Sequence, residues 1–534
     1  MKFKSLFTTI VAAMAVSSCS SDEPKGKTDG DGSINGGNVD INIMVPTERG
    51  SRAGEFEDGE GEESVIKRAL FIFFGESGAL SEIVDVNEFT TTSNTSGSIE
   101  KVAATTIELK GSLIAPTSLV VVLNYNNSIR ANIYSNAKSL EHLKKAIGDY
   151  SVIEEGNGFV MTNSVYQDKS DVVVCETKLT PDAIYKRGEK PEGYKAVNVY
   201  VERVLAKVYV EEKMGGMDIN SSDVEITDPD GSFDGTKIKL TPVIKGMVLS
   251  CTPQKANAFK YINGINYSWK WNDPDNHRSY WAVTPDDASN NVKYTHYTYN
   301  DAVGKNLLDA DQTSQVFYTH PNTSSPNVKE VAPNTASKLL LVAELQDENG
   351  KAVELVKFKN GMYDAEGYLM LAAKALDDLG CSYSVTEEGQ TVVKKYTADM
   401  LEIIKATGDK VKAYEVSFKV KDDAMAGITD NTDKPVDEAI STIEHAWMWK
   451  NGMSYYYAEI LHKGFEGQTE DLHGVVRNHV YKMKLNSMKG LGTPVFDPDD
   501  EIDPEKPSDE LFFIEADINI LRWRIVAQDV NFEW

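Results

Sequence analysis

Cysteine is scarce in this sequence. The chain has 534 residues and only 4 cysteines, too few to stabilise a fold of this length through a disulfide framework. Three of them, Cys175, Cys251 and Cys381, are an odd number at wide spacing, so at least one has no intramolecular partner. We expect all three to be buried free thiols.

Positive charge and long apolar runs are also lacking. Lysine and arginine number 55 against 82 aspartates and glutamates, which gives a formal net charge of -27. Nucleic acid is therefore not an expected partner, because phosphate backbones are bound by clustered Lys and Arg. No apolar run reaches the about 20 residues of a membrane-spanning helix, which excludes a polytopic membrane protein. A hydrophobic content of 41% is nevertheless ordinary for folded domains, and the length predicts about two to four of them.

Catalytic motifs are absent. The sequence contains no G-x-S-x-G, G-x-x-x-x-G-K-[ST], H-E-x-x-H or C-x-x-C. The densest histidine cluster, His462, His473 and His479, has a spacing that matches no metal site, so structural histidines are expected. The acidic stretch 228–234 has Lys239 where a calcium loop needs a glutamate, and is expected to be a solvated turn. We therefore expect no catalytic residue, no cofactor and no metal, and interpret the chain as a protein that is not an enzyme.

Two aromatic clusters leave a binding function open. Residues 267–281 and 447–457 are rich in Tyr and Trp, which can stack on sugars. Core and edge-strand positions are the commoner use of such residues. A glycan site is therefore the less favoured interpretation.

The N-terminus has the pattern of an export signal. Two lysines precede an apolar stretch, residues 6–16, which is too short to cross a bilayer. It runs into Val-Ser-Ser-Cys, which resembles the lipobox of bacterial lipoproteins. Residues 1–18 are thus predicted to be a signal peptide, and Cys19 the lipidated residue that anchors the chain to a membrane. The acidic pair Asp22-Glu23 resembles the tag that exports lipoproteins of the Bacteroidetes to the outer face of the outer membrane.

A strand follows a polar tether. Residues 20–38 contain almost nothing that could be buried and are expected to be flexible. Apolar residues then recur at every second position, the period of a half-buried strand, and a proline ends the pattern. The apolar positions are Val39, Ile41, Ile43 and Val45.

A protease-sensitive loop comes next. Residues 48–63 are polar and rich in glycine, and they contain two arginines. An exposed loop of this kind is a preferred substrate for a trypsin-like protease. The predicted cut lies between Arg52 and Ala53, with Arg49 and Gly50 as the second choice, because Arg52 precedes a small residue in the more Gly-rich and acidic stretch.

Most of the remaining chain is expected to be β-structure. Short runs rich in Val, Ile and aromatic residues, bounded by turn residues, predict many strands of the kind found in sandwiches. The clearest are residues 69–74, 119–123, 172–175, 197–201 and 204–210.

Two stretches have helical spacing instead. Residues 135–147 predict one amphipathic helix that covers an end of the first sandwich. Residues 368–379 predict a second helix, which stops at Gly380.

The predicted organisation has two large domains. The glycine pair at 215–216 suggests the boundary between them, and an acidic, proline-rich linker precedes an apolar terminal segment. The predicted parts are residues 19–52 as tether and removable strand, 53–214 and 215–495 as sandwich domains, 496–510 as a hinge, and 511–534 as a terminal strand segment.

The terminal segment contains two strand patterns that are out of phase. Apolar residues occupy even positions up to Ile520, and the pattern then shifts to Leu521, Trp523 and Ile525, which predicts a bulge or a break. The sequence Asp-Ile-Asn-Ile occurs here at 517–520 and also at 40–43, in the same phase. The even positions of the first pattern are Phe512, Ile514, Ala516, Ile518 and Ile520.

Four blocks of the sequence resemble a known family. They are VERVLAKV at 201–208, SLVVVLN at 118–124, YYYAEILH at 455–462 and the stretch 474–494, which begins GVVRNHVY and ends GLGTP. Together they resemble the major fimbrial subunits, or fimbrillins, of Bacteroidetes type V pili. The similarity extends from the lipobox to Trp534, and 474–494 is its most specific part. The lipobox departs from the usual pattern at Val16, where Leu is common.

This resemblance implies a fold and a mode of assembly. The fold is all-β with few helices, in two transthyretin-like Greek-key β-sandwich domains in tandem. The chain is exported as a lipoprotein, cut by an arginine-specific protease and polymerised by donor-strand exchange into a surface fimbria that supports adhesion and biofilm formation. Its partners are then copies of itself, tip or anchor subunits, the outer membrane before cleavage, and a host protein or glycan receptor.

The residues themselves favour the same mechanism. Burying the four apolar side chains of residues 39–45 at about 1.5–3 kcal/mol each contributes roughly 6–12 kcal/mol. That rivals the whole stability of a domain, about 5–15 kcal/mol, so a cut subunit should hold this leaving strand until a replacement arrives. The hypothesis is that Ile518 and Ile520 of one subunit take the places of Ile41 and Ile43 in the next.

Two alternatives stay open. A monomeric surface lipoprotein, an adhesin or glycan-binding protein, would bind through its aromatic loops and need no proteolysis. A tip or anchor subunit would belong to a fimbria without using both the removable N-terminal strand and the C-terminal donor strand. An anchor subunit need not be cut by a protease, and a tip subunit need not donate a strand.

Overall fold

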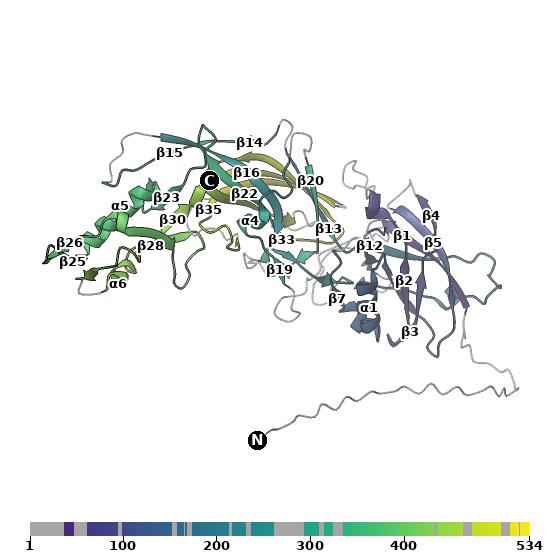
Figure 1. The fold of residues 1–534 in the computed structure, drawn as a ribbon. Coiled ribbons are helices and arrows are strands. Elements are labelled where there is room, and N and C mark those ends of the chain that lie inside the picture. The colour runs from purple at the N-terminus through teal and green to yellow at the C-terminus, as the bar shows by residue number, and fades with distance from the viewer. Residues whose placement is uncertain are drawn as a thin grey trace, which may run out of the picture.

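The computed structural model gives the chain as a series of β-sheets that follow one another along a long axis (Figure 1). It describes residues 37–46, 61–93, 99–151, 157–164, 166–167, 173–212, 216–230, 237–260, 293–308, 314–323, 335–431, 435–462, 472–502, 513–522 and 524–533. Strands dominate and helices are few and short, so the all-β prediction is confirmed.

The first body is a sheet covered on both faces. Its strand order is β3-β2-β6-β8-β12-β1-β5-β4, with β11 beside β6. The strands are β1 (Gly37–Pro46), β2 (Ala69–Phe74), β3 (Leu80–Val86), β4 (Thr90–Ser93), β5 (Ile99–Leu109), β6 (Ser118–Leu123), β8 (Met161–Asn163), β11 (Thr177–Lys178) and β12 (Val197–Arg203). Smaller elements are η1 (Gly61–Ser64), α1 (Asn127–Asn136), α2 (Leu140–Lys144), β7 (Ile147–Gly148), β9 (Tyr166–Gln167), β10 (Val173–Val174) and η2 (Pro181–Ala183).

Strand β2 shows why both faces of this sheet are apolar. Phe71 and Phe73 point into a core shared with β1, β5 and β12, whereas Leu70 and Ile72 point into a second core closed by α1 and α2. A strand buried on both faces is a continuous apolar run, and the prediction for 69–74 is confirmed with the same bounds.

The middle body consists of two facing sheets. One has the order β20-β13-β34-β37-β36, with β14 beside β34, and the other β15-β16-β22-β31-β35. Their strands are β13 (Ala206–Glu212), β14 (Asp218–Ile219), β15 (Ser222–Glu225), β16 (Lys237–Ser250), β20 (Ser314–Thr319), β22 (Lys338–Gln346), β31 (Met453–Glu459), β34 (Val480–Met488), β35 (Thr493–Pro494), β36 (Phe513–Arg522) and β37 (Arg524–Glu533). Small elements join them: β17 (Thr252–Pro253), β18 (Ala256–Asn257), β19 (Tyr294–Thr295), α4 (Tyr299–Ala302), β21 (Asn322–Thr323), β32 (Leu461–His462) and β33 (Leu472–Val475).

A third, smaller body lies at the far end of the molecule from β1 (Figure 1). Helix α5 (Ala365–Asp378) packs Tyr368, Ala372 and Leu376 against a sheet of order β24-β23-β30-β28-β27. Its other elements are β23 (Leu355–Phe358), β24 (Gly361–Tyr363), β25 (Tyr383–Glu387), β26 (Gln390–Lys394), η4 (Ala398–Met400), β27 (Leu401–Lys405), β28 (Glu415–Val420), β29 (Ile428–Asp430), α6 (Val436–Ile440), β30 (Ala446–Trp449) and η5 (Lys450–Gly452).

One predicted helix is wrong and the other is confirmed. Residues 135–147 are divided between the end of α1, a break and α2, because the side chain of Ser139 accepts from His142 N and starts a new helix there. The helix expected at 368–379 exists as α5, which begins earlier because Asp364 caps it. It ends at Asp378 with Leu379 as its C-cap, and Gly380 follows with a positive φ of 78°.

The chain passes from the first body to the middle body between β12 and β13. Strand β12 lies in the first sheet and β13 pairs with β34, so the crossing occurs at Val204 and Leu205. The strand predicted at 204–210 accordingly begins at Ala206. The boundary predicted at 214 and 215 lies after β13, outside the described residues, and stays a prediction.

A buried group of charges holds these two bodies together. Arg477 Nε lies 3.0 Å from Glu202 Oε1, and Lys260 Nζ lies 3.0 Å from Glu202 Oε2. Arg477 also donates to Ala258 O at 3.2 Å and to Thr162 Oγ1 at 2.7 Å. All three charged side chains are buried. Burial is the main cause that lowers the pKa of Lys260 to about 8, against the opposing effect of Glu202.

In the part of the chain that the structure describes, Cys175, Cys251 and Cys381 are buried thiols that form no disulfide, as predicted. Cys175 lies beside the charged group, and burial raises the pKa of its thiol to about 11, so it is not a reactive thiolate. In the described part of the chain, no cluster of three or more His, Cys, Asp or Glu side chains could hold a metal ion. None of the helices described there has the length and apolar character needed to cross a membrane.

The charged group generates a stability prediction. Arg477→Met should lower the free energy of unfolding by about 3–5 kcal/mol, because it removes one partner from a buried ionic group. The matched control is Arg187→Met, which breaks an exposed pair with Glu108 at 2.9 Å and should cost about 0–1 kcal/mol. Urea titration measures both. Equal losses in the two variants would show that the buried group does not hold the bodies together.

Candidate strand-exchange site

The strand predicted at 39–45 lies inside the first sheet rather than at its edge. Strand β1 pairs with β5 in antiparallel register along its whole length, with Ile41 opposite Thr105. On its other side it pairs with β12 in parallel register, with Ile41 opposite Val197. Both edges of β1 are therefore paired with a neighbouring strand.

One face of β1 is fully buried. Val39, Ile41 and Ile43 have no exposed surface and Val45 has 1%. They pack in the core that also contains Phe71 and Phe73 of β2 and Val121 of β6. The predicted strand and its in-out phase are thus confirmed, and its role as a leaving strand stays a prediction.

The other face of β1 carries a polar contact that the sequence analysis missed. The carboxylate of Asp40 accepts from Thr106 Oγ1 at 2.7 Å, from Tyr185 OH at 2.9 Å and from Lys190 Nζ. We call these three donors the Asp40 clamp. Lys190 also lies over the ring of Tyr194, 5.3 Å from its centre. No local signal in the sequence marks these residues, because they come from β5 and from the segment before β12.

The clamp stabilises the charged form of Asp40. Burial raises the pKa of this carboxyl, but the hydrogen bonds from Lys190, Thr106 and Tyr185 outweigh it, so that the pKa is lowered from its ordinary value. A second polar pair lies two residues further along, where Asn42 Nδ2 donates to Asn198 Oδ1 at 3.2 Å. The polar face of β1 is therefore recognised at Asp40 and Asn42.

The chain that follows the predicted cut is held by different contacts. Glu63 of η1 is buried, and its carboxylate pairs with Lys207 Nζ at 2.8 Å and accepts from Tyr318 OH at 2.5 Å. Its carbonyl accepts from Arg203 Nε at 2.5 Å. These partners belong to β12, β13 and β20, so η1 is fixed at the junction of the two bodies independently of β1. The predicted cleavage residues Arg49, Gly50, Arg52 and Ala53, and the predicted lipidation residue Cys19, lie outside the described residues.

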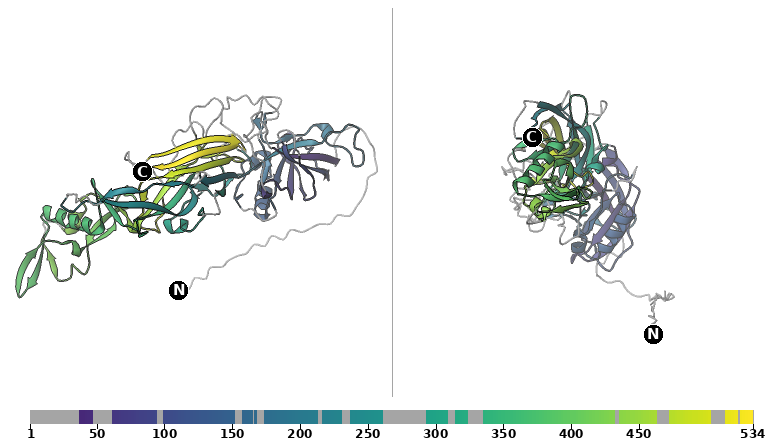
Figure 2. Two further views of the ribbon diagram at one scale, coloured as in Figure 1. Left: turned by 90° about the horizontal axis from the view of Figure 1, so that it is seen from above. Right: turned by 60° about the vertical axis from the view of Figure 1, so that its left-hand side comes forward.

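The C-terminal segment forms a hairpin along the middle body (Figure 2). Strands β36 and β37 are antiparallel, with Arg522 opposite Arg524, so the predicted break between two strand segments is confirmed. Strand β37 pairs with β34 in parallel register, from Val480 opposite Ile525 to Met488 opposite Phe532.

The predicted donor residues lie on the outer strand of this hairpin. Ile514, Ala516, Ile518 and Ile520 belong to β36, which among the described strands pairs only with β37. Phe512 lies outside the described residues. Strand β36 thus follows β37 at the edge of the sheet, and one of its two rows of hydrogen-bonding groups faces no described strand. Its role as a donor stays a prediction.

The aromatic cluster at 447–457 is mostly core. Trp449, Tyr455, Tyr456 and Tyr457 are buried, which agrees with the favoured interpretation of this cluster. Tyr456 OH donates to Gly490 O at 2.8 Å, and a Cβ on Gly492 would lie 2.7 Å from the Tyr456 ring. The other cluster, 267–281, lies outside the described residues.

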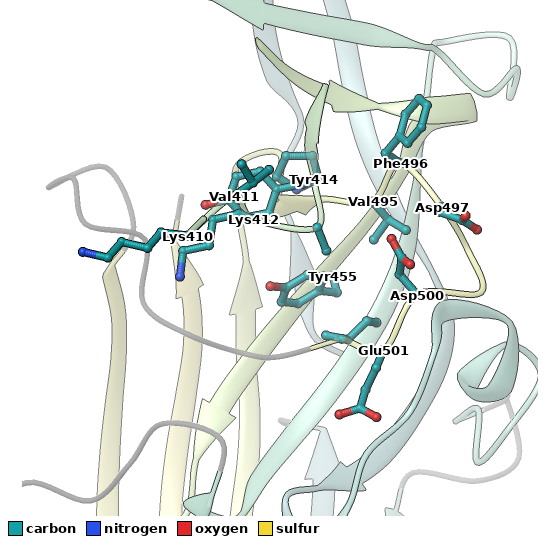
Figure 3. Close-up of a pocket in the computed structure, with 13 residues that line it drawn as sticks. Lys410, Val411, Lys412, Tyr414, Tyr455, Val495, Phe496, Asp497, Asp500 and Glu501 are labelled. Carbon is teal, nitrogen blue, oxygen red and sulfur yellow. The ribbon is translucent and has the colours of Figure 1, made fainter. Parts of the chain in front are cut away.

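A cavity of about 600 Å³ lies next to this cluster. Figure 3 shows Lys410 and Lys412 on one side of Tyr455 and Asp500 and Glu501 on the other. Tyr414, Val495 and Phe496 complete its apolar lining. Its lining thus combines aromatic and charged side chains.

Two of the predicted structural histidines are confirmed. His462 Nδ1 is 2.9 Å from Tyr481 OH, and His479 Nδ1 is 2.8 Å from Arg477 O. Both are buried, and their rings are 5.3 Å apart. The side chain of His473 lies outside the described part of the structure.

Two of the sequence blocks that carry the resemblance meet at the junction of the bodies. The block at 201–208 supplies Glu202 and Arg203, and the block at 474–494 supplies Arg477 and Asn478. Asn478 Oδ1 accepts from Arg203 N at 3.2 Å, and Asn478 adopts a positive φ of 57° there. The most specific part of the resemblance therefore lies in the contact that orients the two bodies.

Comparison with known families agrees with the resemblance. Residues 448–529 match the family model described as major fimbrial subunit protein type IV, fimbrillin, C-terminal. This range extends from β30 into β37 and includes β34 and the hairpin. The resemblance to fimbrillins is thereby confirmed over residues 448–529. No curated protein sequence matches the chain.

Solved structures of fimbrial proteins show a distant likeness. The tip fimbrial protein Mfa3 of Porphyromonas gingivalis is 12% identical, with 71% of this chain and 99% of that chain covered and a TM-score of 0.27. The anchor protein Mfa2 of the same organism is 9% identical, covering 59% and 80%, with a TM-score of 0.21. A fimbrial assembly protein of Parabacteroides distasonis is 11% identical, covering 59% and 87%, with a TM-score of 0.28.

The Asp40 clamp generates a pH prediction. At neutral pH, Asp40→Asn should destabilise the uncut first body by about 1 kcal/mol, since Lys190 is half exposed and its ion pair is partly screened. A lowered carboxyl pKa stabilises the folded state above the ordinary value of 3.8, and this stabilisation is lost as pH falls through the lowered value. Unfolding titrations from about pH 6 to pH 2 should show the two proteins converging. A constant difference across this range would exclude the charge of Asp40 as its cause.

Proposed function

We propose that this chain is a structural shaft subunit of a cell-surface fimbria that polymerises when a strand from a neighbour replaces β1. The observation that carries the proposal is the position of β1. It is a separate N-terminal strand, yet it lies between β5 and β12 with its apolar face in the core. The fimbrillin match at 448–529 supports a role in a fimbria.

Loss of β1 would leave a groove of defined chemistry. Its floor is the core that Val39, Ile41, Ile43 and Val45 now fill, and its walls are the backbone edges of β5 and β12. Exposed apolar surface and unpaired N–H and C=O groups together are a template for another strand. Burial of these four side chains stabilises the subunit by roughly 6–12 kcal/mol. The strand is therefore expected to stay in its groove until a replacement arrives.

Proteolysis is the step that frees β1 in this proposal. An arginine-specific protease cuts after Arg52, or after Arg49, upstream of the firmly held η1. The lipid on Cys19 then keeps only the precursor on the outer membrane. Because Glu63 and its partners hold the new N-terminal end at the junction, the subunit retains its shape when β1 leaves.

The donor in this proposal is β36 of the neighbouring subunit. Ile518 and Ile520 would occupy the places of Ile41 and Ile43. Of the predicted hinge 496–510, only the part after Ile502 would let the strand move away from β37, because Ile502 is buried and its N–H donates to Tyr297 O at 2.9 Å. Strand β36 suits this role because it is the outermost described strand of its sheet.

A second candidate function uses the cavity beside Tyr455. An adhesin or glycan-binding subunit, including one at the tip or anchor of a fimbria, would bind its receptor between Tyr414, Tyr455 and Phe496. Binding of an oligosaccharide by the uncut monomer, lost in Tyr414→Ala, would favour this function. The shaft proposal predicts assembly without any such ligand.

The donor assignment predicts the result of a double substitution. Ile518→Asp with Ile520→Asp should give a folded, secreted and cleaved monomer that forms no filament, since two buried isoleucines would become charges in the groove. The matched control is Ile518→Val with Ile520→Val, which keeps both positions apolar and should still assemble. Electron microscopy and size-exclusion chromatography measure the outcome. Normal filaments from the double variant would rule out β36 as the donor, as would assembly of a chain truncated after Glu510.

The cleavage step predicts a second result. Arg49→Gln with Arg52→Gln should leave an uncut precursor that is stable, exported and monomeric, because β1 stays in its groove. The single variants should still be cut, Arg49→Gln after Arg52 and Arg52→Gln after Arg49. N-terminal sequencing of filaments identifies the cut. A first residue at Cys19 or Ser20 in assembled filaments would contradict the proteolytic switch.

A further inference from the structure

The apolar pattern of β36 does not define a unique position in the groove. Its apolar residues recur at every second position from Ile514 to Ile520. A shift of two residues therefore keeps the same face buried, whereas a shift of one would turn it outward. The register of the incoming strand must be set by something other than alternation.

The polar face of the groove offers a fixed reference point. Thr106 and Tyr185 place their hydroxyl oxygens 2.7 and 2.9 Å from the carboxylate of Asp40, and Lys190 supplies the positive charge. These three donors come from β5 and the segment after η2, and so none of them leaves with β1. Once β1 has left, the clamp is a set of donors with no carboxylate.

We propose that Asp517 of the incoming β36 binds the Asp40 clamp of the next subunit and thereby sets the register of strand exchange. This inference rests on the proposed function. The repeated Asp-Ile-Asn-Ile places Asp517 at the position of Asp40 and Asn519 at that of Asn42, opposite Asn198. Ile518 and Ile520 then fall at the positions of Ile41 and Ile43.

The competing register brings Glu515 to the clamp. The strand is then shifted by two residues, and Ala516 falls at the position of Ile41. The small side chain would leave a cavity in a core position that an isoleucine now fills completely. Asp517 would fall at the position of Asn42, beside Asn198, where β1 has an amide. In the Asp517 register Ala516 falls at the position of Val39 and Arg522 at that of the buried Val45, so the incoming strand must leave the groove at the shift of phase after Ile520. Within the segment 517–520, both differences favour Asp517.

In the free subunit, the pairing of β36 with β37 is electrostatically unfavourable at Asp517. The register of β36 and β37 places Asp517 directly opposite Asp529. Like charges at directly opposed positions destabilise a pair of strands. Transfer to the clamp exchanges an opposing carboxylate for the ammonium of Lys190, so the same residue that sets the register also favours release from the hairpin.

Charge reversal tests the pairing. A full-length chain with Asp40→Lys and Lys190→Asp keeps opposite charges in the uncut subunit, so it should fold and be cleaved. With the native Asp517 it should assemble about tenfold or more slowly, because two carboxylates would meet in the clamp. Adding Asp517→Lys, together with Asp529→Asn so that the hairpin gains no new ion pair, should restore the rate to within about threefold of the wild type. Lys186→Asp, which reverses an exposed lysine of the same segment, is the matched control and should assemble normally.

Glu515 distinguishes the two registers. Glu515→Lys in the same charge-reversed chain should give no recovery, and recovery there instead of with Asp517→Lys would overturn the proposed register. Unchanged assembly of the charge-reversed chain, or no recovery with either lysine, would overturn the role of the clamp. The isoleucine double variant separates this from strand exchange itself. If that variant forms no filament while charge reversal has no effect, exchange through β36 stands and only the clamp proposal fails.

Discussion

The burial of one strand is the constraint on which the rest of this structure depends. Strand β1 fills the space between β5 and β12, and four of its side chains complete the core of the first body. The corresponding free energy, roughly 6–12 kcal/mol, is comparable with the total stability of a domain. The first body is therefore stable with β1 in place, and in the proposed strand exchange an equivalent strand would recover the same free energy.

The C-terminal hairpin of the middle body has the complementary property. The C-terminal hairpin adds β37 to β34 and leaves β36 outermost, so its first strand is bound on only one described side. The junction between the bodies contributes rigidity. Glu202, Lys260 and Arg477 are buried and mutually paired, and Glu63 attaches the segment after the predicted cut to the same region. The parts that are proposed to move are therefore separate from the part that is fixed.

Features with a local cause could be predicted from the sequence. The alternation in 39–45, the continuous apolar run at 69–74 and the phase shift near 520 each follow from side chains close together in the chain, and each corresponds to an observed strand or break. The helix expected at 135–147 was wrong because Ser139 caps a new helix there, an effect that outweighs the apolar spacing. The separate body around α5 was not foreseen, since its sheet combines β23 with β27, β28 and β30 from distant segments.

The sequence by itself determined the strands with a strong local pattern, such as 39–45 and 69–74, that the cysteines are too few for a disulfide framework, and the resemblance of residues 448–529 to fimbrillins. It could do so because strand periodicity and turn chemistry act over a few residues. Only the tertiary structure decided that β1 is a central strand, that Thr106, Tyr185 and Lys190 converge on Asp40, and that Glu202 meets Arg477. These contacts join residues far apart in the chain, and their partners are selected by packing and by the desolvation of charge, which no local pattern records.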